Sequence, residues 1–351
     1  MTFIESLHLT NFRSYGAVAI DGLKSGLIVL HGPNGAGKTN VLEALSLLSP
    51  GRGLRGAKTA EIQKRASDRA QQPWAVAAKV ESPFGPANLG TGADPHVERR
   101  LVRVNGETAK GQAALAEYLS CVWLTPQMDR IFLDGASVRR RFLDRLVFAF
   151  DPGHAGRLTR YENAMAQRAR ILREQTNPDS AWLDALESAM AETGIAIAAA
   201  RADFIRRLRS AGNAADNLFP RAGIGVAGTI DELLSRAPAL EVEKLFRYQL
   251  RETRPQDAVN GGAATGPHRS DFLVNYAERD MPAAQCSTGE QKALLTGIVL
   301  AHARLVAAEK GAPPVLLLDE IAAHLDESRR NGLFTLLQAL GGQVWMTGTD
   351  A

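Results

Sequence analysis

A glycine-rich loop early in the chain has the residue types and the spacing needed to hold the phosphates of a nucleotide. Its residues are Gly32, Pro33, Asn34, Gly35, Ala36, Gly37, Lys38 and Thr39, and Asn40 follows it. In a Gly-x-x-x-x-Gly-Lys-Thr loop, the glycines let backbone N–H groups surround phosphate oxygens, the lysine reaches the β- and γ-phosphates, and the threonine hydroxyl binds Mg²⁺. These residues therefore predict a nucleotide site that also holds magnesium.

The segments on either side of the loop agree with this interpretation. Residues 27–30 form a short apolar run of the kind found in buried strands, and residues 40–45 are typical of a helix with one apolar face. A strand, a glycine-rich loop and a helix in this order bring the N-terminus of the helix, with its unpaired N–H groups, next to the bound phosphates.

An acidic pair 280 residues after Thr39 provides the groups that such a site still needs. Residues 315–318 are all apolar, are too few for an isolated helix, and indicate a central strand that ends at Asp319 and Glu320. Ligands bind at the carboxyl ends of such strands. We expect Asp319 to hold Mg²⁺, usually through water, and Glu320 to orient or deprotonate the attacking water.

A third segment, which contains Ser287 and Gly289, indicates the kind of ATPase. Ser-Thr-Gly-Glu-Gln at residues 287–291 opens a helix, and its hydroxyl, its glycine N–H and the helix N-terminus all favour a phosphate. One nucleotide needs only one cradle, so we expect this one to contact the γ-phosphate of ATP held by another subunit, as in ABC-type ATPases. Residues 323–326 fit the loop that communicates across such a dimer. Taken alone, the Ser-Thr-Gly-Glu-Gln run would be an ordinary capped helix start.

The composition limits the class of protein. With 351 residues, 45% of them hydrophobic, the chain is long enough for two domains with a sizeable core. No apolar run approaches the roughly 18 residues of a membrane span, and no signal peptide is evident, so we expect a soluble, cytoplasmic protein without a membrane partner. Cys121 and Cys286 lack metal-ligand spacing, and we expect both to serve in packing.

The periodicity changes from strands to helices after Gln127. Extended segments are predicted at residues 7–12, 74–80, 100–106, 122–125 and 271–276. Helices are predicted at residues 138–150 with Ser137 as cap, at 154–174, and from Ser180 as cap to about residue 209. The chain then divides into residues 1–127, a helical block at 128–261, and residues 262–351.

Arginine is concentrated in the helical block. Residues 128–221 contain fifteen Arg, no Lys and twelve Asp or Glu, in a chain with a formal net charge of +3. This balance permits contacts with the DNA backbone on one face, but a solvated helical surface gives the same count. Arg139, Arg140 and Arg141 would fan over about 200° of a helix, so we expect at least one to be structural. For Arg13 and Tyr15, nucleotide contact and ordinary packing both remain open.

Together these motifs make the chain resemble the RecF family of bacterial DNA repair proteins over essentially its whole length. The segments that carry the resemblance are residues 11–15, the phosphate loop, residues 139–144, Gly-Pro-His-Arg-Ser-Asp at residues 266–271, and residues 316–333. That family is similar to the heads of SMC proteins, with a short helical arm. The resemblance implies an α/β fold, a P-loop ABC-type ATPase head with a mixed sheet plus an inserted, mainly helical arm.

The resemblance also implies a function. It indicates a weak ATPase that forms an ATP-dependent homodimer, clamps double-stranded DNA and gap junctions, and is reset by hydrolysis. It further implies a role in recombinational repair, helping RecA to load together with RecO and RecR. Lys38, Thr39 and Asp319 of one subunit would then meet Ser287 and Gly289 of the other.

Several positions depart from the family pattern. Glu290 stands where the signature usually has Gln, Gln127 where an acid commonly follows the proline, and Ala136 where a proline is common. Gln127 is a candidate for the glutamine that senses Mg²⁺ and water in ABC-type sites, or else a polar residue at a strand end. His268 and Arg269 match the family without an evident physical role. The family continues past the last strand, whereas this chain stops at Ala351.

Two other functions stay open. A transporter nucleotide-binding subunit would normally lack a helical block of this size and would carry a histidine after the final strand, where this chain has Met-Thr-Gly-Thr at residues 346–349. An ATP-dependent scaffold without DNA contact is the other alternative.

Overall fold

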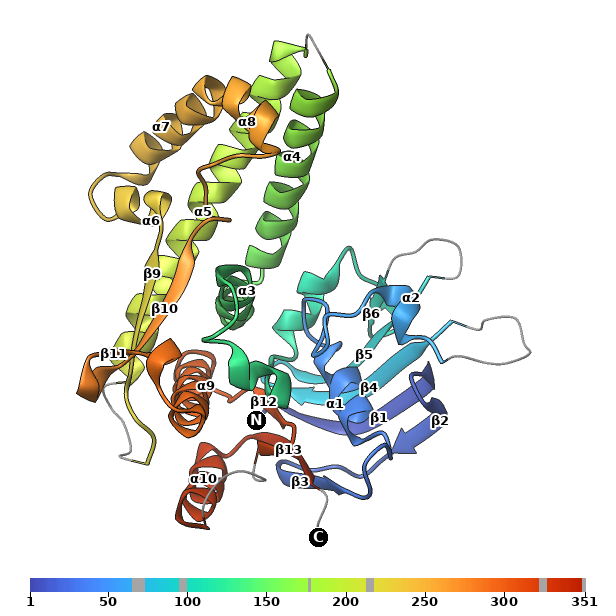
Figure 1. Cartoon of the computed structure of the whole chain (residues 1–351). Helices are drawn as coiled ribbons and strands as arrows, with labels where there is room; N and C mark the ends of the chain where they lie inside the picture. Colours follow the sequence, from blue (N-terminus) through green and yellow to red (C-terminus); the bar gives the residue numbers. More distant parts are fainter. Residues whose placement is uncertain (65–72, 95–99, 176–177, 213–217, 322–326, 349–351) are drawn as a thin grey trace. The chain divides into compact units, whose positions relative to one another are not determined.

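The chain forms two compact units in its computed structural model, and each unit is built from segments that are distant in the sequence. The structure describes residues 1–64, 73–94, 100–175, 178–212, 218–321 and 327–348. The first unit, called the head, comprises Met1–Asp129, Ala214–Arg221 and Ser287–Ala351, and the second, called the arm, comprises Arg130–Asn213 and Ala222–Cys286 (Figure 1). The unit boundaries thus fall after Asp129 and after Cys286, whereas the sequence suggested Gln127 and residue 261.

A parallel sheet in the head orders its strands β3, β13, β12, β8. Their bounds are β3 Gly26–His31, β13 Gln343–Gly348, β12 Val315–Leu318 and β8 Cys121–Leu124. Trp345 pairs with Ile28 of β3 and with Leu317 of β12. Every residue of β8 and β12 is buried, which explains why both strands have continuous apolar runs instead of alternation. Because all four strands are parallel, their carboxyl ends lie along one edge of the sheet.

The other sheet of the head is antiparallel, with the strand order β2, β1, β4, β5, β6, β7. Its strands are β1 Phe3–Phe12, β2 Tyr15–Ile20, β4 Ala75–Ser82, β5 Gly85–Ala93, β6 Arg100–Val104 and β7 Glu107–Thr108. Gln343 of β13 links the two sheets: its buried side-chain amide accepts from the Ile4 N–H at 3.0 Å and donates to the Ile4 carbonyl at 2.9 Å. The expected mixture of strand directions is therefore divided between two sheets.

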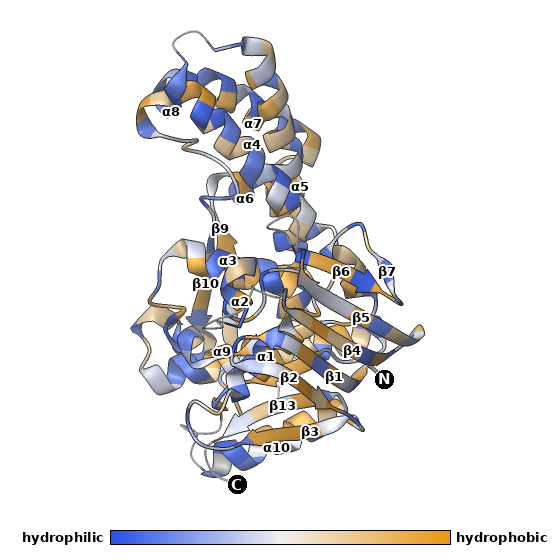
Figure 2. Cartoon of the chain, turned by 90° about the vertical axis from the view of Figure 1, so that its right-hand side faces the viewer, coloured by the Kyte–Doolittle hydropathy of each residue, from blue (hydrophilic) through white to orange (hydrophobic). Residues whose placement is uncertain are grey.

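The helices of the head cover these sheets. They are α1 Lys38–Ser46, α2 Thr59–Ile62, α9 Thr288–Lys310 and α10 Glu327–Leu340, with 3₁₀ turns η1 Gln112–Glu117 and η2 Pro126–Arg130. Helix α1 packs against β1, β8 and β13, and its buried Leu42 and Leu45 share one core with Leu317 and Trp345. Hydrophobic residues lie along the strands of both sheets (Figure 2). The strand before the phosphate loop and the helix after it are thus anchored in a single core.

The arm is mainly helical and contains a small sheet. Its elements are α3 Ala136–Val147, α4 His154–Glu174, α5 Ser180–Gly212, α6 Thr229–Leu234, α7 Ala239–Glu252, α8 Arg254–Asn260, β9 Ala222–Ala227, β10 Asp271–Tyr276, β11 Met281–Pro282, η3 Ala277–Arg279 and η4 Ala283–Gln285. Helices α4 and α7 pack on α5, and Tyr161, Ile197 and Phe246 share a core. Strand β10 lies between β9 and β11. This pairing is why residues 262–286 belong to the arm.

Most elements predicted from the sequence are confirmed, but two helix caps are wrong. Helix α4 has the predicted bounds, whereas α3 begins at Ala136, so Ser137 lies inside its first turn. For α5 the cap is Asp179, whose carboxylate accepts the Ala181 N–H at 2.9 Å. Strands β2 and β5 and helices α6–α8 had not been predicted. Strand β5 contains three glycines and a proline, which are depleted in strands and hid its signal. Residues 323–326 lie outside the described residues.

Candidate nucleotide-binding site

The glycine-rich loop connects β3 to α1, and its backbone adopts conformations that favour glycine. Gly35 has a φ of +83° and Gly37 a φ of +95°, in the left-handed region. A Cβ on Gly37 would also lie 2.5 Å from the hydroxyl oxygen of Tyr15, which itself donates to the Ala36 carbonyl. The glycines are therefore required both by the turn and by the close approach of Tyr15. Tyr15 therefore packs on the phosphate loop, and contact of Tyr15 with a nucleotide stays a prediction.

Lys38 begins α1 and folds back over the loop that precedes it. Its ammonium group donates to the carbonyl oxygens of Gly32 at 2.5 Å and Pro33 at 3.1 Å. Residues 33–36 are exposed, so the loop that the ammonium spans faces solvent. A lysine held in this way has its compact ammonium group at the place where phosphate oxygens would enter the loop.

Thr39 and Asp319 meet although they are far apart in the sequence. The Thr39 hydroxyl donates to the Asp319 carboxylate at 3.1 Å, and the Thr347 hydroxyl donates to the same carboxylate at 2.7 Å. The parallel sheet explains the meeting, because β3, β13 and β12 are neighbours and their carboxyl ends lead to the loop, to Thr347 and to Asp319. Asp319 is only 6% exposed, so both hydroxyls compensate for the burial of its charge.

Glu320 follows Asp319 in a strained backbone conformation. Its φ is +51°, in the left-handed region. For a residue other than glycine, this conformation costs on the order of 1–3 kcal/mol. Its N–H donates to the Thr347 hydroxyl at 2.9 Å, so Thr347 holds both members of the acidic pair. Thr347 was not identified as a site residue from the sequence, because a threonine in an apolar strand gives no separate signal.

The segment expected to contact a second nucleotide begins α9. Ser287 is the N-cap: the Glu290 carboxylate accepts the Ser287 N–H at 2.9 Å and the Ser287 hydroxyl at 2.8 Å. A capping box of this kind uses the glutamate that departs from the family pattern. Ser287 and Gly289 are exposed, and a Cβ on Gly289 would meet nothing within 4 Å. The segment is thus both a capped helix start and an open surface.

Gln127 lies in η2 and is exposed. Its side chain makes no hydrogen bond to another residue in the described ranges, so nothing connects it to Thr39 or Asp319 in the way that these two residues are connected to each other. Its role as a magnesium or water sensor stays a prediction.

A buried ion cluster next to the loop was not predicted from the sequence. Glu43 of α1, whose side chain is 1% exposed, accepts from Arg13 at 2.9 and 2.5 Å and from Arg55 at 2.6 Å. Arg55 also donates to the Asn40 side-chain oxygen at 2.8 Å. Arg13 therefore has a structural role beside the phosphate loop. The one feature of the sequence that could have indicated this cluster is a glutamate, Glu43, among the apolar residues of the buried face of α1.

In the arm, the Gly-Pro-His-Arg-Ser-Asp segment is held by many contacts. His268 lies between the Tyr161 hydroxyl at 2.7 Å and the Ala263 carbonyl at 3.0 Å. A carbonyl only accepts, so Nε2 of His268 carries the proton and Nδ1 accepts from Tyr161. Burial lowers the pKa of His268, which favours this neutral form. His268 thus has a structural role that the sequence did not reveal.

The arginine run in α3 contributes to the same segment. Arg139 forms a two-point ion pair with Asp271 at 2.8 and 2.7 Å, and Arg140 donates to the Ser270 carbonyl at 2.6 Å. Arg141 is exposed. Two of the three arginines are therefore structural, and the third faces solvent.

These features of the head fit a nucleotide with magnesium. The loop supplies left-handed glycines and an ammonium group, and two oxygen groups of the type that Mg²⁺ prefers, Thr39 and Asp319, already lie within hydrogen-bonding distance of each other. Magnesium keeps several waters and is usually bound by few protein groups together with substrate phosphates. Two such oxygen groups beside a phosphate loop match that pattern.

Comparison with known proteins agrees with this site. The family model described as RecF/RecN/SMC N terminal domain matches residues 3–349. The DNA replication and repair protein RecF of Mesorhizobium japonicum is 50% identical to this chain, over 100% of this chain and 92% of that protein. The DNA replication and repair protein RecF of Rhizobium rhizogenes is 48% identical, over 99% of this chain and 92% of that protein. A solved structure of the recombination mediator protein RecF-ATP in the RecFOR pathway has the same fold, with a TM-score of 0.87 at 22% identity, covering 100% of this chain and 92% of that one.

Among the residues that the structure describes, no helix is both long and apolar enough to cross a membrane. The match to the family model and the 50% identity to a relative both extend over nearly the whole chain, including the loop, the acidic strand and the segment that opens α9. The chain therefore belongs to the RecF family of DNA replication and repair proteins.

Proposed function

We propose that this chain is an ATP-dependent DNA-binding protein of recombinational repair, in which ATP binding drives dimerisation and DNA clamping and hydrolysis resets the dimer. The observation that carries the proposal is the 3.1 Å hydrogen bond between Thr39 and Asp319, because it joins the phosphate loop and the acidic strand into one site. The names of the relatives, which are DNA replication and repair proteins, support the DNA part of the proposal.

Each site residue has a specific role in this proposal. The loop N–H groups and Lys38 bind the β- and γ-phosphates, and Thr39 and Asp319 hold Mg²⁺, which neutralises phosphate charge. Glu320 orients or deprotonates the attacking water. The residues of the second subunit, Ser287 and Gly289 of another copy, contact the γ-phosphate, so ATP joins two copies.

The proposal predicts an ATP-dependent homodimer, and Glu320→Gln is the variant that tests it. Without the carboxylate the variant binds ATP but barely hydrolyses it, so the dimer accumulates. Gel filtration with light scattering, with ATP and Mg²⁺ or with ADP, measures the mass of the particle. A monomer in both nucleotides would overturn the proposal.

DNA contact needs its own experiment, because an ATP-dependent scaffold would also dimerise. We expect double-stranded DNA to stimulate ATP hydrolysis, and we expect this stimulation to fade between 50 and 200 mM salt, since phosphate contacts release counterions. A hydrolysis rate that ignores DNA at both salt concentrations would favour the scaffold. DNA with a gap junction, and added RecO and RecR, extend the same assay to the implied partners.

A further inference from the structure

Helix α7 of the arm has one buried face and one exposed face. Val242, Phe246 and Leu250 recur every four residues and are buried in the core that the helix shares with α5. The exposed face contains a tyrosine, Tyr248, which is 61% exposed. Its ring therefore adds little to the core of the arm and is open to a contact outside the chain.

Three cations share this exposed face with Tyr248. Lys244 lies four residues before the tyrosine, Arg251 lies three residues after it, and Arg247 is three or four residues from each of these two cations. Residues at such spacings are neighbours on the surface of a helix. The four side chains fall within about 100° of arc and extend over roughly 10 Å of the helix axis. They form one continuous surface, called the α7 basic face.

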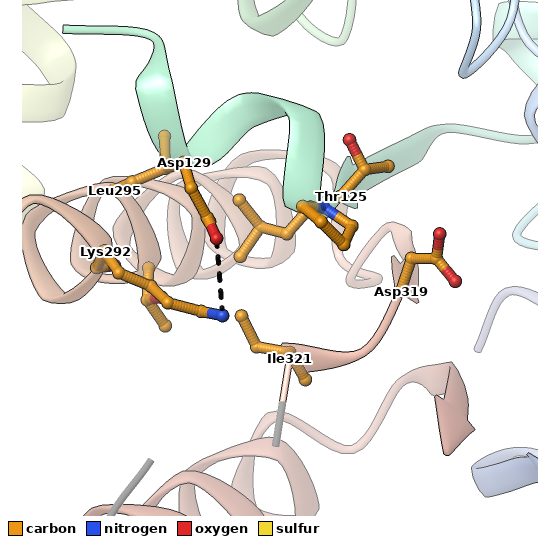
Figure 3. Close-up of a pocket in the computed structure, with 9 residues that line it drawn as sticks. Thr125, Asp129, Lys292, Leu295, Asp319 and Ile321 are labelled. Carbon is orange, nitrogen blue, oxygen red and sulfur yellow. Dashed lines mark hydrogen bonds and ion pairs between the residues drawn. The ribbon is translucent and has the colours of Figure 1, made fainter. Parts of the chain in front are cut away.

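The three cations of the α7 basic face have no acidic partner in the part of the chain that the structure describes, where none of them forms an ion pair or a side-chain hydrogen bond. Paired cations are found in both units: Arg254 of α8 contacts Glu187, and Lys292 of the head lies 3.6 Å from Asp129 (Figure 3). Like charges at neighbouring positions of a helix repel one another. The α7 basic face thus lacks the compensating charge that a bound anion would supply.

The tyrosine indicates which kind of anion fits. Lysine and arginine bind phosphates, and an aromatic ring beside them can stack on a nucleic-acid base. The centre of a protein interface is depleted of charged residues, whereas Lys244 separates the exposed Leu240 from Tyr248. On its other side Tyr248 has Leu245 and Glu252, so phosphates fit only the side of the cations. A polyanion with flat apolar groups matches this surface better than a protein does.

The same ring distinguishes between two forms of DNA. A duplex offers phosphates to the cations, but the flat faces of its bases are covered by the neighbouring base pairs. Only an unpaired base can lie on the ring of Tyr248, and such stacking tolerates any base because each has a flat face.

We propose that the α7 basic face binds single-stranded DNA, with one unpaired base stacked on Tyr248 and the adjoining phosphates held by Lys244, Arg247 and Arg251. The proposal rests on the proposed function and names the form of DNA that this surface takes, which is the unpaired strand of a gapped substrate. Binding of duplex DNA does not use Tyr248.

Substitution of Tyr248 separates stacking from charge. Fluorescence anisotropy of a labelled thymine strand measures the affinity of the full chain, with and without ATP. We expect Tyr248→Leu to weaken binding about fivefold or more with an unchanged salt slope, which is the loss of one stacked base, and we expect Tyr248→Phe to bind as the natural chain. Trp182→Leu removes another exposed aromatic side chain of the arm and should have no effect. A natural chain that binds no strand in either condition would overturn the proposal.

DNA without accessible bases sharpens this test. On a strand of abasic sites, and on a duplex of the same length, we expect Tyr248→Leu and the natural chain to bind equally well. A loss of equal size on all three DNAs would mean that the substitution acts on the helix or on phosphate binding, and the stacking contact would be wrong.

The cations predict a change in salt dependence. Each phosphate contact with a single strand contributes about 0.7 to the slope of log affinity against log salt. The combined variant with Lys244→Gln, Arg247→Gln and Arg251→Gln should therefore lower the slope by about 2. Arg170→Gln removes an exposed arginine of α4 that is paired with Glu174, and it should leave the slope unchanged. The proposal does not survive an unchanged slope in the combined variant.

Photochemical cross-linking locates the base directly. A strand that carries 5-iodouracil cross-links to a stacked aromatic ring under ultraviolet light, and mass spectrometry identifies the peptide. We expect a cross-link at residue 248 in the natural chain and in Tyr248→Phe, and its absence in Tyr248→Leu. Cross-links at other residues alone would place the strand elsewhere.

These measurements separate failure of the proposal from failure of the proposed function. If single-strand binding ignores every α7 substitution while ATP still drives dimerisation and duplex DNA still stimulates hydrolysis, only the assignment of the α7 basic face is wrong. If the strand binds through Tyr248 but no ATP-dependent dimer forms, the proposed function fails and the α7 basic face stands. A labelled oligoglutamate peptide that binds more tightly than the strand, and that is lost in the combined variant, would overturn the proposal in favour of an acidic protein partner.

Discussion

The Thr39 hydroxyl donates a hydrogen bond of 3.1 Å to the Asp319 carboxylate across 280 residues of sequence. The contact requires β3, β13 and β12 to be parallel neighbours, so it depends on the whole central sheet of the head. It also places two oxygen groups of the type that a hard cation prefers beside the phosphate loop.

Separate substitution of these two residues, as Thr39→Val and Asp319→Asn, should abolish magnesium-dependent ATP hydrolysis. Each variant removes one oxygen ligand, and loss of metal assistance costs several kcal/mol of transition-state stabilisation, or a rate decrease on the order of 100-fold or more. Phosphate release against Mg²⁺ concentration measures this. Thr10→Val, on an exposed position of β1, is the matched control and should behave as the natural chain. A normal magnesium response in Asp319→Asn would remove it from the site.

Replacement of Glu43 should destabilise the head strongly. Glu43→Gln leaves Arg13 and Arg55 without their shared carboxylate, and breaking a buried pair costs about 3 kcal/mol or more. Glu5→Gln removes the exposed pair with Lys79, which we expect to cost at most about 1 kcal/mol. Urea unfolding of both variants compares the two costs. Equal midpoints would show that the Glu43 cluster contributes no more than a surface pair.

Glu290, the glutamate of the α9 capping box, should weaken the binding of a second nucleotide's γ-phosphate at the start of α9. Its carboxylate lies 2.8 Å from the Ser287 hydroxyl, where a negative charge opposes an incoming phosphate. Glu290→Gln removes the charge, and glutamine still serves in a capping box, so the helix start is kept. We expect a tighter ATP-dependent dimer, measured by sedimentation in the Glu320→Gln background. A weaker dimer would mean that the carboxylate assists the contact.

The arginines of α3 should separate into structural and DNA-contacting residues. Arg141→Gln removes an exposed charge and should lower the salt slope of DNA binding by about one phosphate contact, without changing stability. Arg139→Gln breaks the two-point pair with Asp271 and should instead lower the unfolding midpoint. Fluorescence anisotropy with labelled duplex DNA at several salt concentrations measures the slope. An unchanged slope in Arg141→Gln would remove this arginine from the interface.

The Asp144 carboxylate should contribute stability to the arm that is lost in acid. Burial by itself would raise its pKa, but the Arg201 guanidinium and the hydrogen bond from His154 outweigh burial and hold the pKa below its ordinary value. A depressed folded-state pKa means that the contribution is complete above the unfolded pKa of about 3.9 and disappears as the pH falls through the folded value. The stability difference between the natural chain and Asp144→Asn should therefore shrink below about pH 4.

Asp231 provides a control of opposite sign within the same unit. Burial raises the pKa of its carboxyl group, despite the hydrogen bond from Ser270. The folded chain therefore binds this proton more readily than the unfolded chain, and the natural chain should gain stability over Asp231→Asn as the pH falls. Urea unfolding of both variants between pH 3 and 7 gives the two trends. Parallel trends in the two variants would contradict the assignment.

The sequence by itself determined the parts whose chemistry is local. The phosphate loop, the apolar runs of β3, β8 and β12, and the bounds of α4 follow from glycine spacing, short buried runs and a regular helical period. The predictions of a helix cap and of a weak strand failed for equally local reasons: Asp179 competes with Ser180 as the cap of α5, and β5 is rich in glycine. Such near-degenerate choices differ by less free energy than the tertiary contacts supply.

Only the tertiary structure decided which distant residues act together. It brought Thr347 to both acidic residues, paired Glu43 with two arginines, and joined Lys292 to Asp129. It also showed that residues 262–286 belong to the arm, because β10 pairs with β9. The physical reason is that the pairing of strands and the burial of charges depend on neighbours that are remote in the chain, and no pattern within a short window of sequence records them.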